Sequence, residues 1–138
     1  MVIEYIENVG RRRMVLVGYL FPPALLVGII HSVALERYWY WLYPWMDVLT
    51  HYLGGFFVAL SILWLIFLSG SQKFLQENTV RLLCVALLAG FIIGVLWEVF
   101  EFATGMFTFE NWYPDTLFDI IFDCVGAMSA ALLFNTSR

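Results

Sequence analysis

Six side chains that can bind a cation or move a proton lie in three short segments of an otherwise apolar sequence. They form three pairs with spacings of three or four residues: Asp47 and His51, Glu98 and Glu101, and Asp119 and Asp123. Such spacings place both members of a pair on one face of a helix. Carboxylate oxygens and imidazole nitrogens bind hard or borderline divalent cations, and the same groups act as general acids and bases.

Four apolar segments would position these pairs. They cover residues 14–35, 48–68, 80–102 and 116–134, and each is close to the ~20 residues that cross a bilayer core. Of the 138 residues, 62% are hydrophobic and 13% are charged, and the mean hydropathy is +0.84, whereas soluble domains carry about 25% charged residues. The sequence therefore predicts an all-α integral membrane bundle of four transmembrane helices, forming one domain over residues 1–138.

Basic residues predict the orientation of this bundle. Arg11–Arg13 precede the first helix, Lys73 and Arg81 flank the second connection, and Arg138 ends the chain, whereas Arg37 alone falls on the other side. The positive-inside rule then places both termini in the cytoplasm of a multi-pass protein of the cytoplasmic (inner) membrane. Because chain direction alternates, all three polar pairs would share one depth in the outer half of the bilayer.

Local sequence features predict the shape and packing of the helices. Pro22 and Pro23 predict a kink in the first helix, since proline removes a backbone donor. Close helix contacts are expected at small residues, namely Gly54, Gly55, Gly90, Gly94, Gly126, Ala127, Ala130 and Ala131. Cys84 and Cys124 are expected to be buried thiols at different depths, too far apart to form a disulfide.

The polar pairs need compensation inside a membrane. No Lys or Arg lies in any segment at their depth, and a charged group at the centre of a membrane helix costs roughly 2.5–3.5 kcal/mol. Adjacent carboxylates also repel one another. Either some carboxylates hold protons, or one or two cations hold the cluster together.

A divalent metal ion is the cofactor that these residues favour. Its candidate ligands are Asp47, His51, Glu98, Glu101, Asp119 and Asp123. An oxygen-rich set with an imidazole favours Mg²⁺, Mn²⁺, Ca²⁺, Zn²⁺ or non-haem iron over copper. The Glu-x-x-His motifs of di-iron bundles are absent. His31 is a further candidate, whereas Asp115, beside Pro114, is expected to reach the headgroup water.

Three motifs carry a family resemblance: Asp47-x-x-x-His51, Trp97-Glu98-x-x-Glu101, and Asp115-Thr116-x-x-Asp119-x-x-x-Asp123-x-x-Gly126-Ala127. In order and spacing they resemble the VanZ-like and YjdF-like small membrane proteins. Val48 stands where VanZ-like proteins often have Lys, and Asp123 where they often have Asn, so the last motif is closer to the YjdF-like pattern. Because the activity of both families is poorly defined, the resemblance implies a polar site at the six candidate residues and no particular reaction.

Three functions fit these residues. The first is a metal-dependent hydrolase or transferase that acts on a lipid headgroup or a lipid-linked substrate, with His51 and Asp47 as catalytic residues. The second is a transporter or channel component for cations or protons, because intramembrane carboxylates commonly mark ion pathways. The third is a structural protein whose polar cluster shares protons and fixes helix packing. The expected partners are membrane lipids and further copies of the chain in a homo-oligomer, and no nucleic acid is expected.

Overall fold

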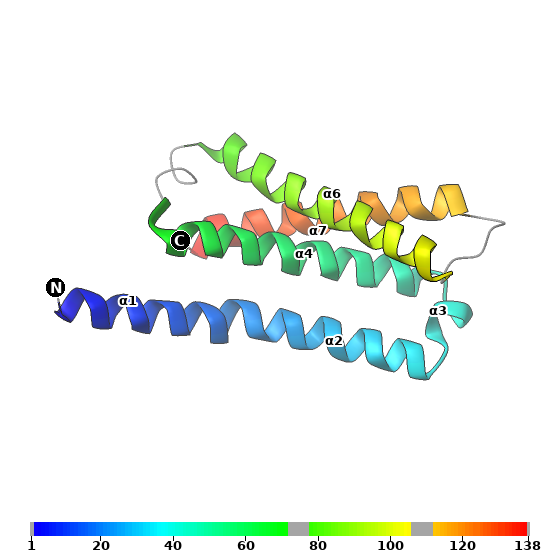
Figure 1. The fold of residues 1–138 in the computed structure, drawn as a ribbon, viewed down its shortest axis with the longest axis horizontal. Helices are drawn as coiled ribbons and strands as arrows, with labels where there is room; N and C mark the ends of the chain where they lie inside the picture. Colours follow the sequence, from blue (N-terminus) through cyan, green and yellow to red (C-terminus); the bar gives the residue numbers. More distant parts are fainter. Residues whose placement is uncertain (1, 72–77, 106–111, 138) are drawn as a thin grey trace.

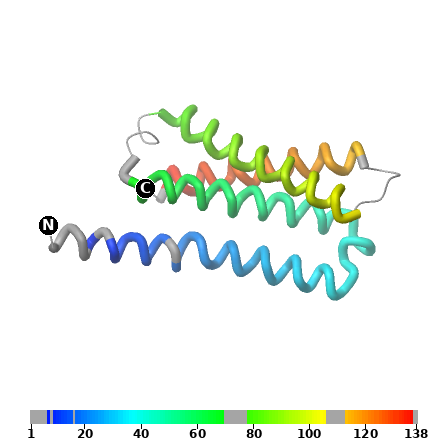
Figure 2. Tube along the Cα trace, in the orientation of Figure 1, coloured from blue at the N-terminus to red at the C-terminus, as the bar shows by residue number. Residues whose placement is uncertain are grey.

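The computed structural model describes residues 2–71, 78–105 and 112–137, which are helical apart from short turns and caps (Figures 1 and 2). The α-helices are α1 (Val2–Val15), α2 (Phe21–Glu36), α3 (Trp39–Leu42), α4 (Trp45–Ile66), α6 (Thr79–Thr104) and α7 (Trp112–Ser137). Two π-helical turns, Leu16–Leu20 and Phe67–Ser71, follow α1 and α4. No strand occurs within these three ranges.

Four helical stretches are long and apolar enough to cross a membrane: Val9–Glu36, Trp45–Ser69, Thr79–Thr104 and Tyr113–Thr136. Each predicted segment lies within one of these stretches, so the all-α, four-span prediction is confirmed. The protein is thus an integral, multi-pass membrane protein. Figure 1 also shows the two termini at the same end of the bundle, as an even number of spans requires.

The helix of the first span changes its pitch about one turn before Pro22 and Pro23, where the sequence predicts a kink. Pro22 and Pro23 occupy the first turn of α2, where their missing N–H groups are tolerated. The irregularity precedes them as the π-helical turn Leu16–Leu20, because carbonyl groups one turn before a proline lose their usual donor. The helix therefore continues through this region with altered pitch (Figure 1).

Helices α4, α6 and α7 pack against one another, and α2 runs alongside α4 (Figures 1 and 2). Their apolar core lies toward the end that holds the termini. Its largest buried side chains are Leu60, Leu63, Trp64, Leu82 and Phe134. Trp64 packs edge-on against Phe134, with ring centroids 5.0 Å apart. This half of the bundle is held by apolar packing.

Glycines bring the three helices into close contact at mid-height. A Cβ atom on Gly55 would overlap the backbone of Asp123, and one on Gly126 would overlap the backbone of Tyr52. A Cβ atom on Gly90 would lie 2.8 Å from the Cβ of Ala127. The predicted role of the small residues in helix packing is therefore confirmed.

The two cysteines differ from expectation. Both are free, but Cys84 is exposed on the outside of α6 and Cys124 is half-buried. An apolar thiol that faces lipid gains nothing from burial in protein, so these positions need not be buried.

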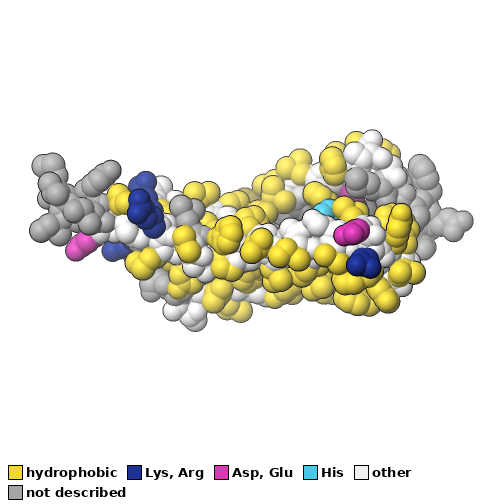
Figure 3. All heavy atoms as spheres, turned by 90° about the horizontal axis from the view of Figure 1, so that it is seen from below, with side chains coloured by type: hydrophobic (Ala, Val, Ile, Leu, Met, Phe, Trp, Pro, Cys, Tyr) yellow, Lys and Arg dark blue, Asp and Glu magenta, His cyan; other side chains and the backbone are white. Residues whose placement is uncertain are grey.

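Charges are segregated along the bundle. Most Lys and Arg side chains in view in Figure 3 gather toward the N-terminal end, whereas histidine and acidic side chains appear near the other end. Hydrophobic side chains cover most of the surface between them. The end opposite the termini also carries α3 and exposed aromatic side chains, including Tyr38, Trp41, Tyr43 and Trp45, which is the composition of a membrane interface.

Candidate metal centre

Three helices bring the predicted polar pairs together at the end of the bundle that carries α3. Asp47 and His51 lie in the first two turns of α4, and Glu98 and Glu101 lie near the end of α6. The first half of α7 provides Asp115, Asp119 and Asp123. Since the chain alternates in direction, the start of α4, the end of α6 and the start of α7 meet at one level (Figure 1).

His51 is the centre of the cluster, and Asp123 fixes its orientation. The Nδ1 atom of His51 lies 2.9 Å from Oδ2 of Asp123, and both side chains are buried, at 4% and 6% exposed. A carboxylate accepts a hydrogen bond, so Nδ1–H is the donor. In the neutral ring this leaves Nε2 unprotonated, with its lone pair available to a cation.

The carboxylate of Asp123 occupies a space made by missing side chains. A Cβ atom on Gly94 of α6 would lie 2.5 Å from its Oδ2 atom. On α4, a Cβ on Gly54 would lie 3.9 Å from its Oδ1 atom. Gly94 of α6 thus admits a buried carboxylate where a larger residue would exclude it, whereas a Cβ on Gly54 would make an ordinary van der Waals contact.

The Nε2 atom of His51 faces two further carboxylates without bonding to either. It lies 3.8 Å from Oδ1 of Asp47 and 3.8 Å from Oε1 of Glu98, which is too long for a hydrogen bond. Within the described residues, both Nε2 of His51 and Oε1 of Glu98 are buried and without a hydrogen-bond partner. Buried polar atoms are almost always paired, so this pair of atoms could hold a ligand.

The separations fit a cation. Metal bonds of ~2.1 Å in a tetrahedral site place ligand atoms about 3.4 Å apart. The 3.8 Å distances from His51 to Asp47 and Glu98 need to shorten by only a few tenths of an ångström, which rotation of a carboxylate can supply.

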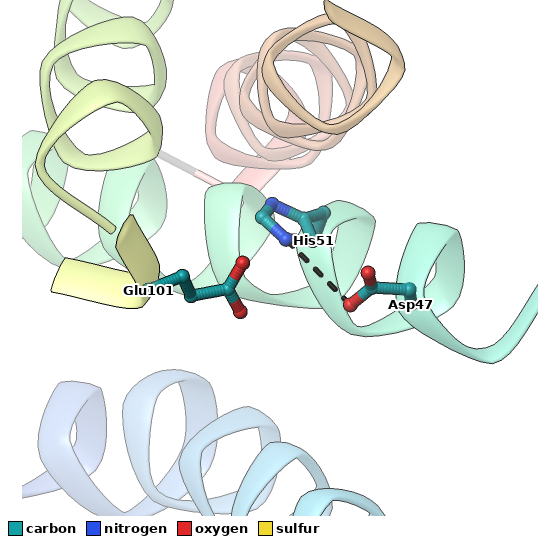
Figure 4. A group of neighbouring side chains, drawn as sticks. All are labelled: Asp47, His51 and Glu101. Carbon is teal, nitrogen blue, oxygen red and sulfur yellow. Dashed lines mark ion pairs between the residues drawn. The ribbon is translucent and has the colours of Figure 1, made fainter. Parts of the chain in front are cut away.

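Three groups of ligand atoms lie within 4.8 Å of one another in the described parts of the chain. The first is Asp47, His51 and Glu101, whose side chains converge from α4 and α6 in Figure 4. The others are His51, Glu98 and Asp119, of which Glu98 is 11% exposed and the other two are buried, and Asp47, Asp115 and Asp119. Five of the six candidate ligands therefore converge directly, whereas Asp123 lies behind His51 as its hydrogen-bond partner.

Two of the glutamates are themselves held by hydrogen bonds. The Thr116 hydroxyl donates to Oε2 of Glu98 at 2.5 Å, and the indole N–H of Trp97 donates to Oε1 of Glu101 at 2.8 Å. Such outer contacts orient metal ligands and leave their other oxygen available. The positions of Trp97, four residues before Glu101, and of Thr116, next to Asp115, were the only sequence signals for these donors.

Two residues stand differently from the sequence interpretation. Asp115 is exposed but joins Asp47 and Asp119 in one of the three groups, a role that the headgroup interpretation missed. His31 lies outside all three groups: its Nδ1 atom is 2.7 Å from the hydroxyl of Tyr40.

Burial raises the pKa of Tyr40. A hydrogen bond with Thr50 lowers this pKa, and the nearby charges of Asp47 and Glu101 raise it further.

The cluster carries a large excess of negative groups. The three ion pairs seen at this end all involve His51, with Asp47, Glu98 and Asp123 as partners. Two unit charges 4 Å apart repel by about 4 kcal/mol at an effective dielectric constant of 20. One imidazolium ion does not balance so many carboxylates, so the cluster needs protons or a cation.

Comparisons with known proteins relate the chain to a protein of Thermotoga maritima and to a family of predicted membrane proteins. An uncharacterized protein of Thermotoga maritima is 29% identical over 100 residues, which is 70% of this chain and 48% of that protein. The chain thus spans about half the length of this curated relative. No solved structure matches the chain. Residues 9–138 match a family model described as predicted membrane protein (DUF2238), and the chain therefore belongs to the DUF2238 family of predicted membrane proteins.

Proposed function

We propose that this protein is a metal-dependent membrane hydrolase or transferase whose divalent ion is held by His51, Glu98 and Asp119. The observation that carries the proposal is the pair of buried atoms without partners, Nε2 of His51 and Oε1 of Glu98, facing each other at 3.8 Å. A buried imidazole lone pair opposite a buried carboxylate oxygen is a typical metal-binding arrangement.

The residues around this ion divide into ligands and proton carriers by burial. The His51 side chain is 4% exposed and its Nδ1 atom is engaged by Asp123, so its free nitrogen serves as a ligand. The Asp47 side chain is 29% exposed and 3.8 Å from Nε2 of His51, so it can exchange protons with incoming water. Asp47 is therefore the general base of the proposal, and His51 the catalytic residue that binds the metal.

A divalent ion at this position would polarise a phosphoryl or carbonyl oxygen and lower the pKa of a bound water. The substrate class follows from the position of the site. The cluster lies at the end of the bundle that carries the exposed aromatic residues Trp41 and Trp45, which is the depth of lipid headgroups. A lipid headgroup or a lipid-linked group reaches this depth without leaving the membrane.

The basic residues support an orientation for the proposal. Arg11–Arg13 lie at the end opposite the cluster (Figure 1), so the positive-inside rule would put the cluster toward the outer leaflet of the cytoplasmic membrane. A reporter fused to the C-terminus, active only on the cytoplasmic side, tests this assignment.

The motifs support a wider relationship. We propose that the VanZ-like and YjdF-like proteins share this arrangement, since the residues of the three motifs that resemble theirs fall in one cluster here. Asp47, His51 and Glu98 come from separate motifs and approach within 3.8 Å. The relationship concerns the site alone and transfers no activity.

A transport pathway for cations or protons receives less support from the described residues. Below the cluster, the interface between α4 and α7 is closed by buried apolar side chains such as Leu60, Leu63 and Phe134. A continuous polar route through the bundle would have to cross this packing. The cluster is thus better suited to bind an ion at one side than to pass it on.

Metal content tests the proposal. We expect detergent-purified wild-type protein to contain near-stoichiometric divalent metal by inductively coupled plasma mass spectrometry, and Glu98→Gln and His51→Ala to lose it. Glu36→Gln is the matched control, because Glu36 is an exposed carboxylate at the end of α2 outside the three ligand groups. Wild-type protein without metal, even after incubation with divalent ions, would favour protonated carboxylates and a structural role instead.

A further inference from the structure

Each pair of the three ligand groups has one residue in common: His51, Asp47 or Asp119. Asp119 belongs to the group of His51 and Glu98 and also to the group of Asp47 and Asp115. A carboxylate has two oxygens and can bind one cation with each. We propose that the centre holds two divalent ions bridged by the carboxylate of Asp119, the second ion being bound by Asp47 and Asp115. This inference rests on the proposed metal site and extends it.

The burial and the hydrogen bonding of Asp119 are a second observation, separate from its place in two groups of ligands. Asp119 is 2% exposed, and none of the hydrogen bonds among the described residues reaches its carboxylate. Glu98 and Glu101, in contrast, each accept a hydrogen bond from a neighbouring side chain. A carboxylate that is nearly fully buried and without a donor is rare in proteins. Because its oxygens lie near both sets of ligands, cations are the partners that the geometry offers.

The charge balance also favours more than one cation. The carboxylate of Asp123 accepts the hydrogen bond from His51 and lies outside the three ligand groups. The three ligand groups contain five acidic side chains: Asp47, Glu98, Glu101, Asp115 and Asp119. One divalent ion would leave three of these negative charges without a cation, whereas two divalent ions would leave one. Charges at membrane depth are tolerated when they are paired.

The two ion sites differ in burial and in ligand chemistry. The ligands of the inner site are the buried His51 and Asp119 and the 11% exposed Glu98. They include a nitrogen atom, which suits Zn²⁺, Mn²⁺ or Fe²⁺. The outer site has only oxygen ligands, which suits Mg²⁺, Mn²⁺ or Ca²⁺. Its Asp115 is exposed and its Asp47 is partly exposed. The outer ion would therefore keep coordination positions open for water and for an oxygen of the substrate. Asp47 would bind this ion with one oxygen and keep its other oxygen as the proton acceptor of the proposed function.

Manganese is the probe for both sites, because it accepts nitrogen and oxygen ligands and is paramagnetic. We expect wild-type protein in detergent, dialysed against Mn²⁺, to retain two ions per chain. Asp115→Asn should retain one, and Glu36→Gln should retain two. Ions bridged by a carboxylate lie about 3.5–4 Å apart, so the wild-type sample should give the electron paramagnetic resonance signal of a coupled pair, and Asp115→Asn that of an isolated ion.

The outcomes separate this inference from the function on which it rests. A wild-type content of one ion, unchanged in Asp115→Asn, would overturn the second site and leave the first intact. No bound ion would overturn both. Two ions without magnetic coupling would overturn the bridging role of Asp119. The ion content and the magnetic coupling of the wild-type protein therefore test the bridged pair even if a variant fails to fold.

Discussion

The hydrogen bond between His51 and Asp123 joins α4 to α7 at the level of the polar cluster, with Nδ1 and Oδ2 2.9 Å apart. The two residues are 72 positions apart in the chain, and both are buried. The contact turns the free nitrogen of His51 toward Asp47 and Glu98. Helix packing and the geometry of the candidate site thus depend on the same pair.

The role of Asp123 as the orienting partner of His51 can be measured. Asp123→Asn keeps the size of the side chain and can still accept from Nδ1–H, but it loses the negative charge. Removal of such an outer partner typically weakens metal affinity 10–100-fold. We therefore expect weaker but measurable binding in competition with a chelator, whereas His51→Ala abolishes it. Equal affinity in Asp123→Asn and wild type would show that the charge has no role.

The close contact between Gly94 and Asp123 predicts that a larger residue at position 94 destabilises the fold. A Cβ atom there would lie 2.5 Å from Oδ2 of Asp123, and overpacking of this kind typically costs 1–3 kcal/mol. Gly94→Ala should lower the thermal unfolding temperature in detergent and displace the Asp123 carboxylate. Gly28→Ala is the control, since nothing lies within 4 Å of its Cβ position. If both variants melt at the same temperature, α6 and α7 are not packed as described.

The hydroxyl of Thr116 should influence metal binding through Glu98. Thr116→Val keeps the shape of the side chain and removes the donor to Oε2 of Glu98. We expect metal affinity to fall roughly 10-fold, because the glutamate loses the contact that orients it. Thr136→Val is the matched control: its hydroxyl bonds only to the carbonyl of Leu133 at the far end of α7. An unchanged affinity in Thr116→Val would contradict this role.

Metal removal should destabilise the wild-type protein selectively. A ligand that binds only the folded state at 100 times its Kd stabilises that state by about 2.7 kcal/mol. Chelation should therefore lower the unfolding temperature of wild type but leave Glu98→Gln unchanged. Restored metal should return the wild type to its original temperature. A wild-type melting curve that is identical with and without metal would indicate that protons satisfy the cluster.

The four helices could be predicted from sequence because apolar runs of about 20 residues have few alternatives to spanning a membrane. The approach of Asp47, Glu98 and Asp119 followed from the same reasoning, since alternating chain direction brings their helix ends to one level. The particular contacts could not be predicted in this way. Helical periodicity gives the face of a residue, but not which neighbour meets it across an interface.

Asp123 and Asp115 illustrate this limit. From sequence, Asp123 is one more ligand and Asp115 a headgroup charge. Their neighbours in the fold differ: Asp123 contacts the inward nitrogen of His51, and Asp115 approaches Asp47 and Asp119. These contacts depend on how closely α7 approaches α4, which is decided by glycines such as Gly55 and Gly126.

Those glycines also have a consequence for how the chain tolerates change over evolution. A Cβ atom would come too close to neighbouring atoms at Gly55, Gly90, Gly94 and Gly126. At Gly10, Gly18 and Gly28, no atom lies within 4 Å of the Cβ position. In a saturation mutagenesis screen, the first four should be as intolerant of substitution as the acidic residues, although they carry no functional group. These four glycines, which act only by lacking a side chain, would then identify the site in a distant relative in which other residues replace the ligands.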